Sequence, residues 1–252
     1  YGLDGPISVL KYDINGDGTI SGNDRVILFF GTGRNADAAA YYALDVTDKL
    51  NPQLLWTVDG STLSGLGQAW STPTITRVNI SGATQNSQRI VLVMGGGYDA
   101  AEDNRTYYNA DTVGNHVFMI DALTGSLLWS AGATGSTFNS ARMDHAIPSP
   151  AVVLDVDGDG YADRMYVGDM AAQLWRFDIT NGSTAGNLVA GGVIASLGTK
   201  KDASHAAADQ RRFYSAPDVS AVQKPKVTPF LSIALGSGYR GHPLDNTIHD
   251  RF

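Results

Sequence analysis

The sequence contains no cysteine, so disulfide bonds, thiolate zinc sites and cysteine nucleophiles are all excluded. It has no run of the roughly 18 apolar residues that a membrane-spanning helix needs, and we expect no signal peptide within these residues. It also lacks a run of Lys and Arg, and its formal net charge is -7. Because nucleic-acid binding depends on clustered positive charge, we exclude a nucleic-acid partner. The chain begins at Tyr1 rather than at a methionine, and we expect it to be part of a larger protein.

Catalytic patterns are missing as well. The five histidines form no His-x-x-x-His pair, which argues against a zinc site. No nucleophile, base and orienting group form a recognisable pattern, so the sequence predicts a protein without enzymatic activity. The glycine-rich segments 31–33 and 95–97 are not followed by a helical pattern, so we interpret them as strand ends rather than phosphate-binding loops. Arg240 is expected to be an ordinary exposed charge.

Internal repetition is the most informative feature of the sequence. Four segments begin with a proline that precedes an alternating strand pattern, and each is followed by a second β-rich run that ends in glycine. Several short strands per unit, joined by glycine-rich turns, are typical of the blades of a β-propeller, which are stable because they stack on their neighbours. The prolines are Pro6, Pro73, Pro150 and Pro217, and the glycines are Gly31, Gly95, Gly168 and Gly236.

The predicted fold is therefore all-β: a β-propeller with quinoprotein-like blades, present in this chain as a partial propeller. A β-sandwich with irregular strands is the alternative, which the regular spacing of the units disfavours. Trp56, Trp129 and Trp175 recur at matching places in the units, so we expect them to pack between blades. All of 1–252 is assigned to one propeller domain, with repeat units near residues 1–70, 71–147 and 148–214 and an incomplete unit at 215–252.

An acidic segment at residues 155–163 carries the strongest chemical signal. Its aspartates stand at positions 1, 3, 5 and 9 of the loop, with Gly160 at position 6 to permit a sharp turn. Asp and Gly also form ordinary turns, but four carboxylates this close would repel one another without a cation. Calcium prefers oxygen ligands, so we interpret the segment as a calcium loop inserted in a hairpin. Its expected ligands are Asp155, Asp157, Asp159, the carbonyl of Tyr161 and Asp163.

A second segment, residues 13–24, matches the same pattern with oxygen-bearing side chains at positions 1, 3, 5, 9 and 12. It has only three carboxylates, so we expect its binding to be weaker or more dependent on the fold. Magnesium suits either loop less well, because it prefers few protein ligands and strict octahedral geometry. The expected ligands are Asp13, Asn15, Asp17, the carbonyl of Thr19, Ser21 and Asp24.

Several of these segments are similar to those of a known family. Together they resemble the C-terminal propeller of the PilY1 family of type IV pilus biogenesis factors, and the resemblance runs over almost the whole chain. Its most specific parts are the acidic loop joined to the Gly-Asp and Leu-Trp-Arg-Phe-Asp strands, and the Gly-Ser-Gly-Tyr-Arg segment. The residues concerned are 42–48, 155–163, 166–169, 174–178 and 236–245.

The resemblance implies a large secreted protein, exported through the periplasm and associated with the pilus tip at the outer-membrane surface. It implies minor pilins or other tip components as partners, and adhesion to host or abiotic surfaces through regions outside this chain. It also implies Ca2+ as the cofactor, with its occupancy regulating pilus extension, retraction and twitching motility. The family's calcium loop corresponds to residues 155–163, whereas the segment 13–24 is less firmly covered by the resemblance.

Two other functions stay open on the sequence. The Ala-Leu-Asp and Leu-Leu-Trp strands are also similar to those of pyrroloquinoline-quinone dehydrogenases, in which calcium and the quinone share the central funnel. Many of those enzymes stack the quinone on a vicinal disulfide, which a chain without cysteine cannot form. The third function is that of a calcium-dependent carbohydrate-binding propeller.

Overall fold

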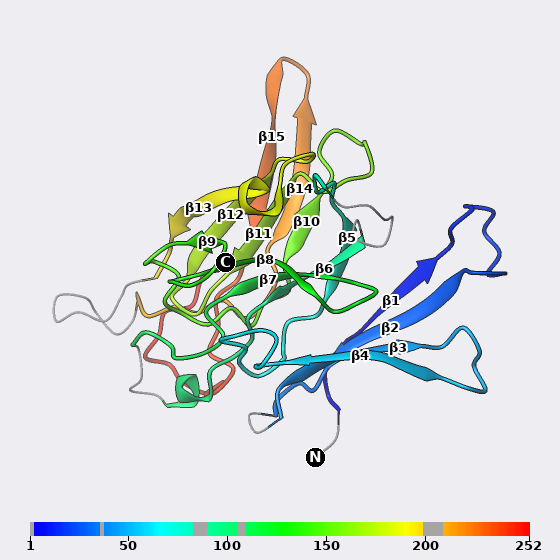
Figure 1. The fold of residues 1–252 in the computed structure, drawn as a ribbon. Coiled ribbons are helices and arrows are strands. Elements are labelled where there is room, and N and C mark those ends of the chain that lie inside the picture. Colours follow the sequence, from blue (N-terminus) through cyan, green and yellow to red (C-terminus); the bar gives the residue numbers. More distant parts are fainter. Residues whose placement is uncertain (1–2, 36–37, 83–89, 105–108, 199–208) are drawn as a thin grey trace.

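The computed structural model describes residues 3–35, 38–82, 90–104, 109–198 and 209–252. It confirms the all-β prediction, with strands arranged in several separate sheets (Figure 1). In the described residues, the short 3-10 helices η2 (Ala100–Asp103) and η3 (Ala185–Asn187) lie between strands. In the described part of the chain, no helix has the length and apolar character that crossing a membrane requires.

Each sheet is built from strands that follow one another along the chain. The first sheet contains β1 (Ile7–Tyr12), β2 (Arg25–Gly31), β3 (Ala40–Asp45) and β4 (Gln53–Asp59). The second contains β5 (Thr74–Arg77), β6 (Ile90–Gly95), β7 (Val117–Asp121), β8 (Leu127–Gly132) and the short parallel β9 (Phe138–Asn139). The third contains β10 (Val152–Leu154), β11 (Arg164–Gly168), β12 (Gln173–Ile179) and β13 (Val189–Ser196). A final hairpin joins β14 (Asp218–Lys224) and β15 (Val227–Ala234).

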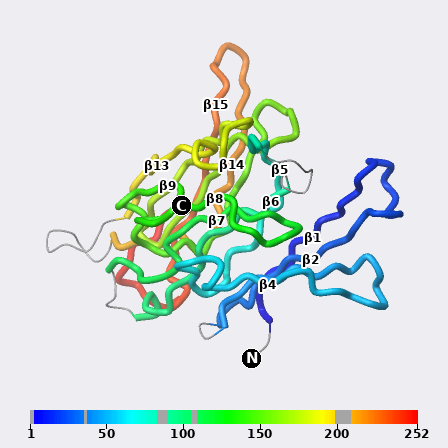
Figure 2. Tube along the Cα trace, viewed as in Figure 1, coloured from blue at the N-terminus to red at the C-terminus, as the bar shows by residue number. Residues whose placement is uncertain are grey.

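The second sheet is buried on both faces, which explains why β6 reads as a continuous apolar run. All six residues of β6 are buried. Val91 and Val93 belong to the apolar cluster shared with the third sheet, whereas Leu92 and Met94 belong to the cluster shared with the first sheet. The second sheet is thus packed between its neighbours, as the propeller-like stacking of blades requires, and the chain passes from the first sheet through the second to the third (Figure 2).

The strands that open the sheets lie together and are tied by hydrogen bonds between units. The Ser8 hydroxyl donates to the carbonyl of Pro73 at 2.6 Å, and the Thr74 hydroxyl donates to the carbonyl of Ala151 at 2.8 Å. The Ser71 hydroxyl donates to the carbonyl of Ser149 at 3.0 Å. These bonds bring together the strands β1 and β5 and the proline-containing segments that precede β5 and β10. The assignment of the whole chain to one domain stays a prediction.

The tryptophans do pack between sheets, but the prediction that all three occupy matching places is wrong for Trp175. Trp56 and Trp129 lie on the fourth strands β4 and β8, whereas Trp175 lies on the third strand β12. The strand register shows the difference. Gly95 at the end of β6 pairs with Val117, and Gly168 at the end of β11 pairs with Leu174. The next residues, Phe118 and Trp175, therefore occupy equivalent positions on the third strands of their sheets. The Leu-Trp pair occurs by coincidence in two different strands. Trp175 therefore packs back onto the second sheet, in one cluster with Trp129.

Candidate metal centre and its surroundings

The two acidic segments occupy the same place in two different sheets. The Asp13 loop, residues 13–24, connects the antiparallel strands β1 and β2 of the first sheet. The Asp155 loop, residues 155–163, connects the antiparallel strands β10 and β11 of the third sheet. Each loop therefore begins where the opening strand of its sheet ends, within a hairpin as the sequence predicted.

In the Asp155 loop, backbone N–H groups hold each carboxylate in position. The side chain of Asp155 accepts hydrogen bonds from the N–H groups of Gly158 at 2.7 Å and Gly160 at 2.9 Å. Asp157 accepts from the N–H of Asp159 at 3.1 Å, and Asp159 accepts from the N–H of Tyr161 at 2.8 Å. The two glycines have positive φ values of 82° and 88°, which lets the chain curl around the carboxylates.

The consequence is a group of three converging carboxylates. One oxygen from each of Asp155, Asp157 and Asp159 lies within 4.8 Å of the others, and all three residues are exposed. Asp163 closes the loop, because its carboxylate accepts from the N–H groups of Val156 at 2.7 Å and Asp157 at 3.3 Å. Of the predicted ligands, the structure brings three carboxylates together and places the fourth against the loop backbone.

The Asp13 loop repeats this hydrogen-bonding pattern. Asp13 accepts from the N–H groups of Gly16 at 2.7 Å and Gly18 at 2.8 Å, as Asp155 does from its glycines. Asn15 accepts from the N–H of Asp17 at 3.1 Å, and Asp17 accepts from the N–H of Thr19 at 2.7 Å. The predicted ligand positions 1, 3 and 5 therefore have the same backbone frame in both loops.

The remaining predicted ligands of the Asp13 loop are Ser21 and Asp24. Asp24 accepts from the N–H of Ile14 at 2.8 Å and from the N–H of Ser21 at 3.0 Å, so it closes the loop as Asp163 does in the other sheet. These two hydrogen bonds, aided by the charge of Lys11, hold the pKa of Asp24 below its usual range. The closing carboxylate is at position 12 here and at position 9 in the Asp155 loop, at the positions where the sequence pattern has the last aspartate of each loop.

The two loops differ most in how their negative charge is balanced. In the Asp13 loop the Asn15 amide donates to the Asp17 carboxylate at 2.9 Å, and the Lys11 ammonium donates to the carbonyl of Gly18 at 2.5 Å. The Asp155 loop has Asp157 where the other loop has Asn15, so carboxylate replaces amide at that point. Oxygen-only donors with high negative charge fit a hard cation such as calcium.

Buried charges form a second polar centre that the sequence did not indicate. The Glu102 carboxylate and the Arg212 guanidinium pair at 2.6 Å, and both side chains are almost completely buried. Burial raises the pKa of Glu102 even though Arg212 acts in the opposite direction, and burial raises the pKa of Asp111 to about 8. The pair links η2 to the segment before β14. Because its members are 110 residues apart in the sequence, no local motif could have revealed it.

Comparison with known proteins gives one consistent group of relatives. No family model matches the chain. The type IV pilus biogenesis factor PilY1 of Pseudomonas aeruginosa strain PAO1 is 30% identical over 147 residues, which is 58% of this chain and 11% of that protein. A PilY1 homolog of Xylella fastidiosa is 25% identical over 181 residues, which is 67% of this chain and 11% of that protein.

A solved structure shows the same fold. The crystal structure of the Pseudomonas aeruginosa PilY1 C-terminal domain matches with a TM-score of 0.63 and 22% sequence identity. The match covers 94% of this chain and 44% of that domain. The resemblance predicted from the sequence is confirmed: the chain is similar in sequence to PilY1 and in fold to its C-terminal domain. It spans about a tenth of the length of the curated relatives.

Proposed function

We propose that this chain, a relative of the PilY1 C-terminal domain, is a calcium-binding, non-enzymatic part of a type IV pilus biogenesis protein. The Asp155 loop is the main calcium site, and the Asp13 loop is a second, weaker one. Calcium occupancy regulates the extension and retraction of the pilus. The chain acts outside the cell at the pilus tip, where minor pilins or other tip components are its partners.

The observation that supports calcium binding most directly is the convergence of Asp155, Asp157 and Asp159. Three carboxylate oxygens within 4.8 Å of one another repel each other unless a cation or protons intervene. The backbone already orders these side chains, so a cation enters a preformed loop and the entropic cost of binding is reduced. Main-chain carbonyls such as that of Tyr161 and the carboxylate of Asp163 complete the oxygen ligands.

The regulatory part of the proposal follows from charge. A bound calcium ion cancels most of the negative charge of an exposed loop and fixes its conformation. A partner that meets this face therefore encounters two different surfaces, one strongly acidic and one nearly neutral. The type IV pilus role of the PilY1 relatives supplies the class of partner.

Calcium titration calorimetry on the metal-stripped protein tests the binding. We expect two binding events, of which Asp159→Ala removes the tighter one and Asp17→Ala removes the weaker one. Asp218→Ala, which removes an exposed carboxylate at the start of β14, is the matched control and leaves both events in place. Absence of binding in the unaltered chain would refute the calcium assignment.

The pilus role needs a test in cells. Asp159→Ala is introduced into the full-length protein in its native host, and surface pili and twitching are measured with calcium present and with calcium chelated. We expect the variant to behave like the chelated wild type under both conditions. A variant that binds no calcium yet shows normal, calcium-responsive piliation would separate the binding from the regulation and overturn the regulatory proposal.

A further inference from the structure

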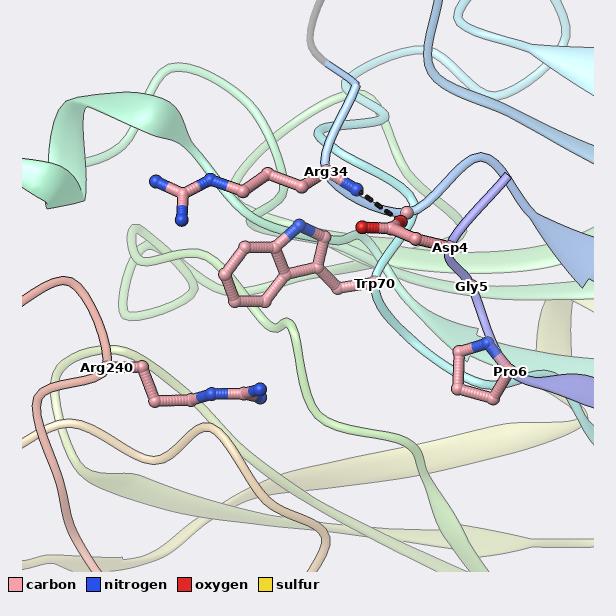
Figure 3. Close-up of a pocket in the computed structure, with 7 residues that line it drawn as sticks. Asp4, Gly5, Pro6, Arg34, Trp70 and Arg240 are labelled. Atoms are coloured by element: carbon pink, nitrogen blue, oxygen red, sulfur yellow. Dashed lines mark hydrogen bonds between the residues drawn. The ribbon is translucent and has the colours of Figure 1, made fainter. Parts of the chain in front are cut away.

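A hollow of about 370 Å3 lies beside the segment that leads into β1 (Figure 3). The Asp13 loop follows the C-terminal end of β1, whereas the hollow is lined by the segment that precedes this strand, through Asp4, Gly5 and Pro6. A second hollow of about 290 Å3 adjoins it, sharing Pro6, Trp70 and Arg240. The segments that open all four units contribute to these walls, through Pro6, Thr72, Pro148, Pro150, Ser215 and Ala216.

An aromatic platform forms the floor of the site. Trp70 stacks on Tyr98 with ring centres 4.2 Å apart, and Tyr214 lies against both rings. The indole N–H of Trp70 donates to the side-chain carbonyl of Gln68 at 3.0 Å, which fixes the orientation of the ring. The hydroxyl of Tyr98 donates to Asp103 at 2.9 Å. Trp70 is only partly buried, so a rigid aromatic surface is left facing the hollow.

Two arginines flank this platform from different parts of the chain (Figure 3). The guanidinium carbon of Arg34 lies 5.9 Å from the centre of the Trp70 ring, and that of Arg240 lies 5.5 Å from it. Arg34 is already paired with the carboxylate of Asp103. Arg240 forms no ion pair with any residue that the structure describes, so its charge is available to a ligand.

The position of Arg240 is held by its neighbours. Tyr239 is buried beneath the Arg212 guanidinium at 4.2 Å, and its hydroxyl donates to the carbonyl of Glu102 at 3.2 Å. The His242 ring contacts the carbonyl of Asp103 at 2.7 Å. The turn that carries Arg240 is therefore anchored on both sides, and the guanidinium is kept against Trp70 before any ligand arrives.

We propose that this hollow binds a small ring-shaped carboxylate, either a sugar acid or an aromatic acid. The ring lies on the Trp70 platform, and the carboxylate pairs with the Arg240 guanidinium, whose planar fork matches two carboxylate oxygens. The carboxylate of Asp4 also lines the hollow, where it accepts a hydrogen bond from the backbone N–H of Arg34 at 3.0 Å, so the ligand carboxylate binds on the side of Arg240. This site is separate from the acidic loops and needs no calcium.

The test uses the intact chain in the presence of a calcium chelator, so its result does not depend on the proposed calcium function. Glucuronate and 2-naphthoate are titrated, together with their neutral counterparts glucose and 2-naphthamide, by calorimetry and tryptophan fluorescence. We expect one acid to bind in preference to its neutral counterpart. Arg240→Gln should weaken that binding about tenfold or more, since it removes a charge-assisted hydrogen bond.

Trp70→Leu is the second variant, expected to lose both the binding and the fluorescence change. Arg251→Gln is the matched control, because it removes an exposed arginine outside the hollow and should leave the binding unchanged. Preference for glucuronate identifies a sugar acid, and preference for 2-naphthoate identifies an aromatic acid. The proposal is overturned by equal binding of the neutral compounds, by unchanged affinity in Arg240→Gln, or by no binding of either acid at millimolar concentration.

Discussion

The Asp13 and Asp155 loops have nearly the same backbone but opposite electrostatic situations. In both, the aspartate at position 1 accepts hydrogen bonds from two glycine N–H groups, and a later aspartate closes the loop. In the first, an amide and a lysine already offset the charge. In the second, three carboxylates converge, and no amide or lysine side chain of the described residues is seen to donate to them. The same arrangement of aspartates and glycines therefore gives both loops the same hydrogen-bond frame, whereas the net charge of each loop is set by the residue at position 3 and by the strand before the loop.

The largest expected effect comes from making the Asp155 loop resemble the other one. In Asp157→Asn, the new amide can donate to Asp159 as Asn15 does to Asp17, so one negative charge is lost and another is capped. We expect the calcium dissociation constant of this loop to rise about tenfold or more. Titration calorimetry measures it, with Asp218→Asn as the control. An unchanged constant would show that position 3 does not distinguish the loops.

The reciprocal change should strengthen the weaker loop. Asn15→Asp places a third carboxylate beside Asp13 and Asp17, and we expect calcium affinity to increase by about three- to tenfold. The gain is smaller than the loss above because Lys11 stays in place. The measurement is made in an Asp159→Ala background, so that the heat comes from the Asp13 loop. Equal affinity with and without the substitution would contradict the charge argument.

A smaller effect is expected from the lysine. In Lys11→Met, the cation that now reaches the carbonyl of Gly18 is removed, so the loop carbonyls and carboxylates are freed for calcium. We expect a gain in affinity of about two- to threefold at low salt that shrinks as salt screens the charges. Titrations at two ionic strengths in the same Asp159→Ala background provide the check. A gain in calcium affinity that persists at high salt would show that Lys11 acts through the conformation of the loop rather than through its charge.

The smallest effect concerns the calcium-free Asp13 loop at acid pH. The pKa of Asp24 is lowered by the N–H groups of Ile14 and Ser21. The hydrogen bonds therefore stabilise the folded loop at pH values above 3.8, the ordinary pKa of an aspartate. This stabilisation is lost as the pH falls through the lower pKa that Asp24 has in the folded protein. An NMR titration should show the Ile14 and Ser21 amides shifting together below pH 3.8, and not in Asp24→Asn. A midpoint for Asp24 at or above pH 3.8 would contradict the hydrogen bonds from Ile14 and Ser21.

Local spacing was enough to predict the sheets and the loops. The prolines and glycines that punctuate each unit marked the strands, and alternate aspartates marked the hairpin loops, because both signals depend on neighbours in sequence. The place of Trp175 was mispredicted because the same Leu-Trp pair serves two different strands. The Glu102–Arg212 pair and the contact of Arg240 with Trp70 join distant segments. Only the folded chain brings these partners together, so a reading of local patterns could not find them.

The hydrogen bonds between opening strands also link each unit to the next unit along the chain. Ser8 reaches the start of the second sheet, and Ser71 and Thr74 reach the start of the third, so each bond joins a unit to the next one. Once one sheet has formed, the next sheet can pack on its apolar face and make the hydrogen bonds between opening strands. Folding of consecutive sheets in chain order is consistent with these contacts. Each unit is therefore stabilised mainly by contacts with its sequence neighbours, so the cost of ordering one unit is offset by the apolar face that the adjacent sheet provides.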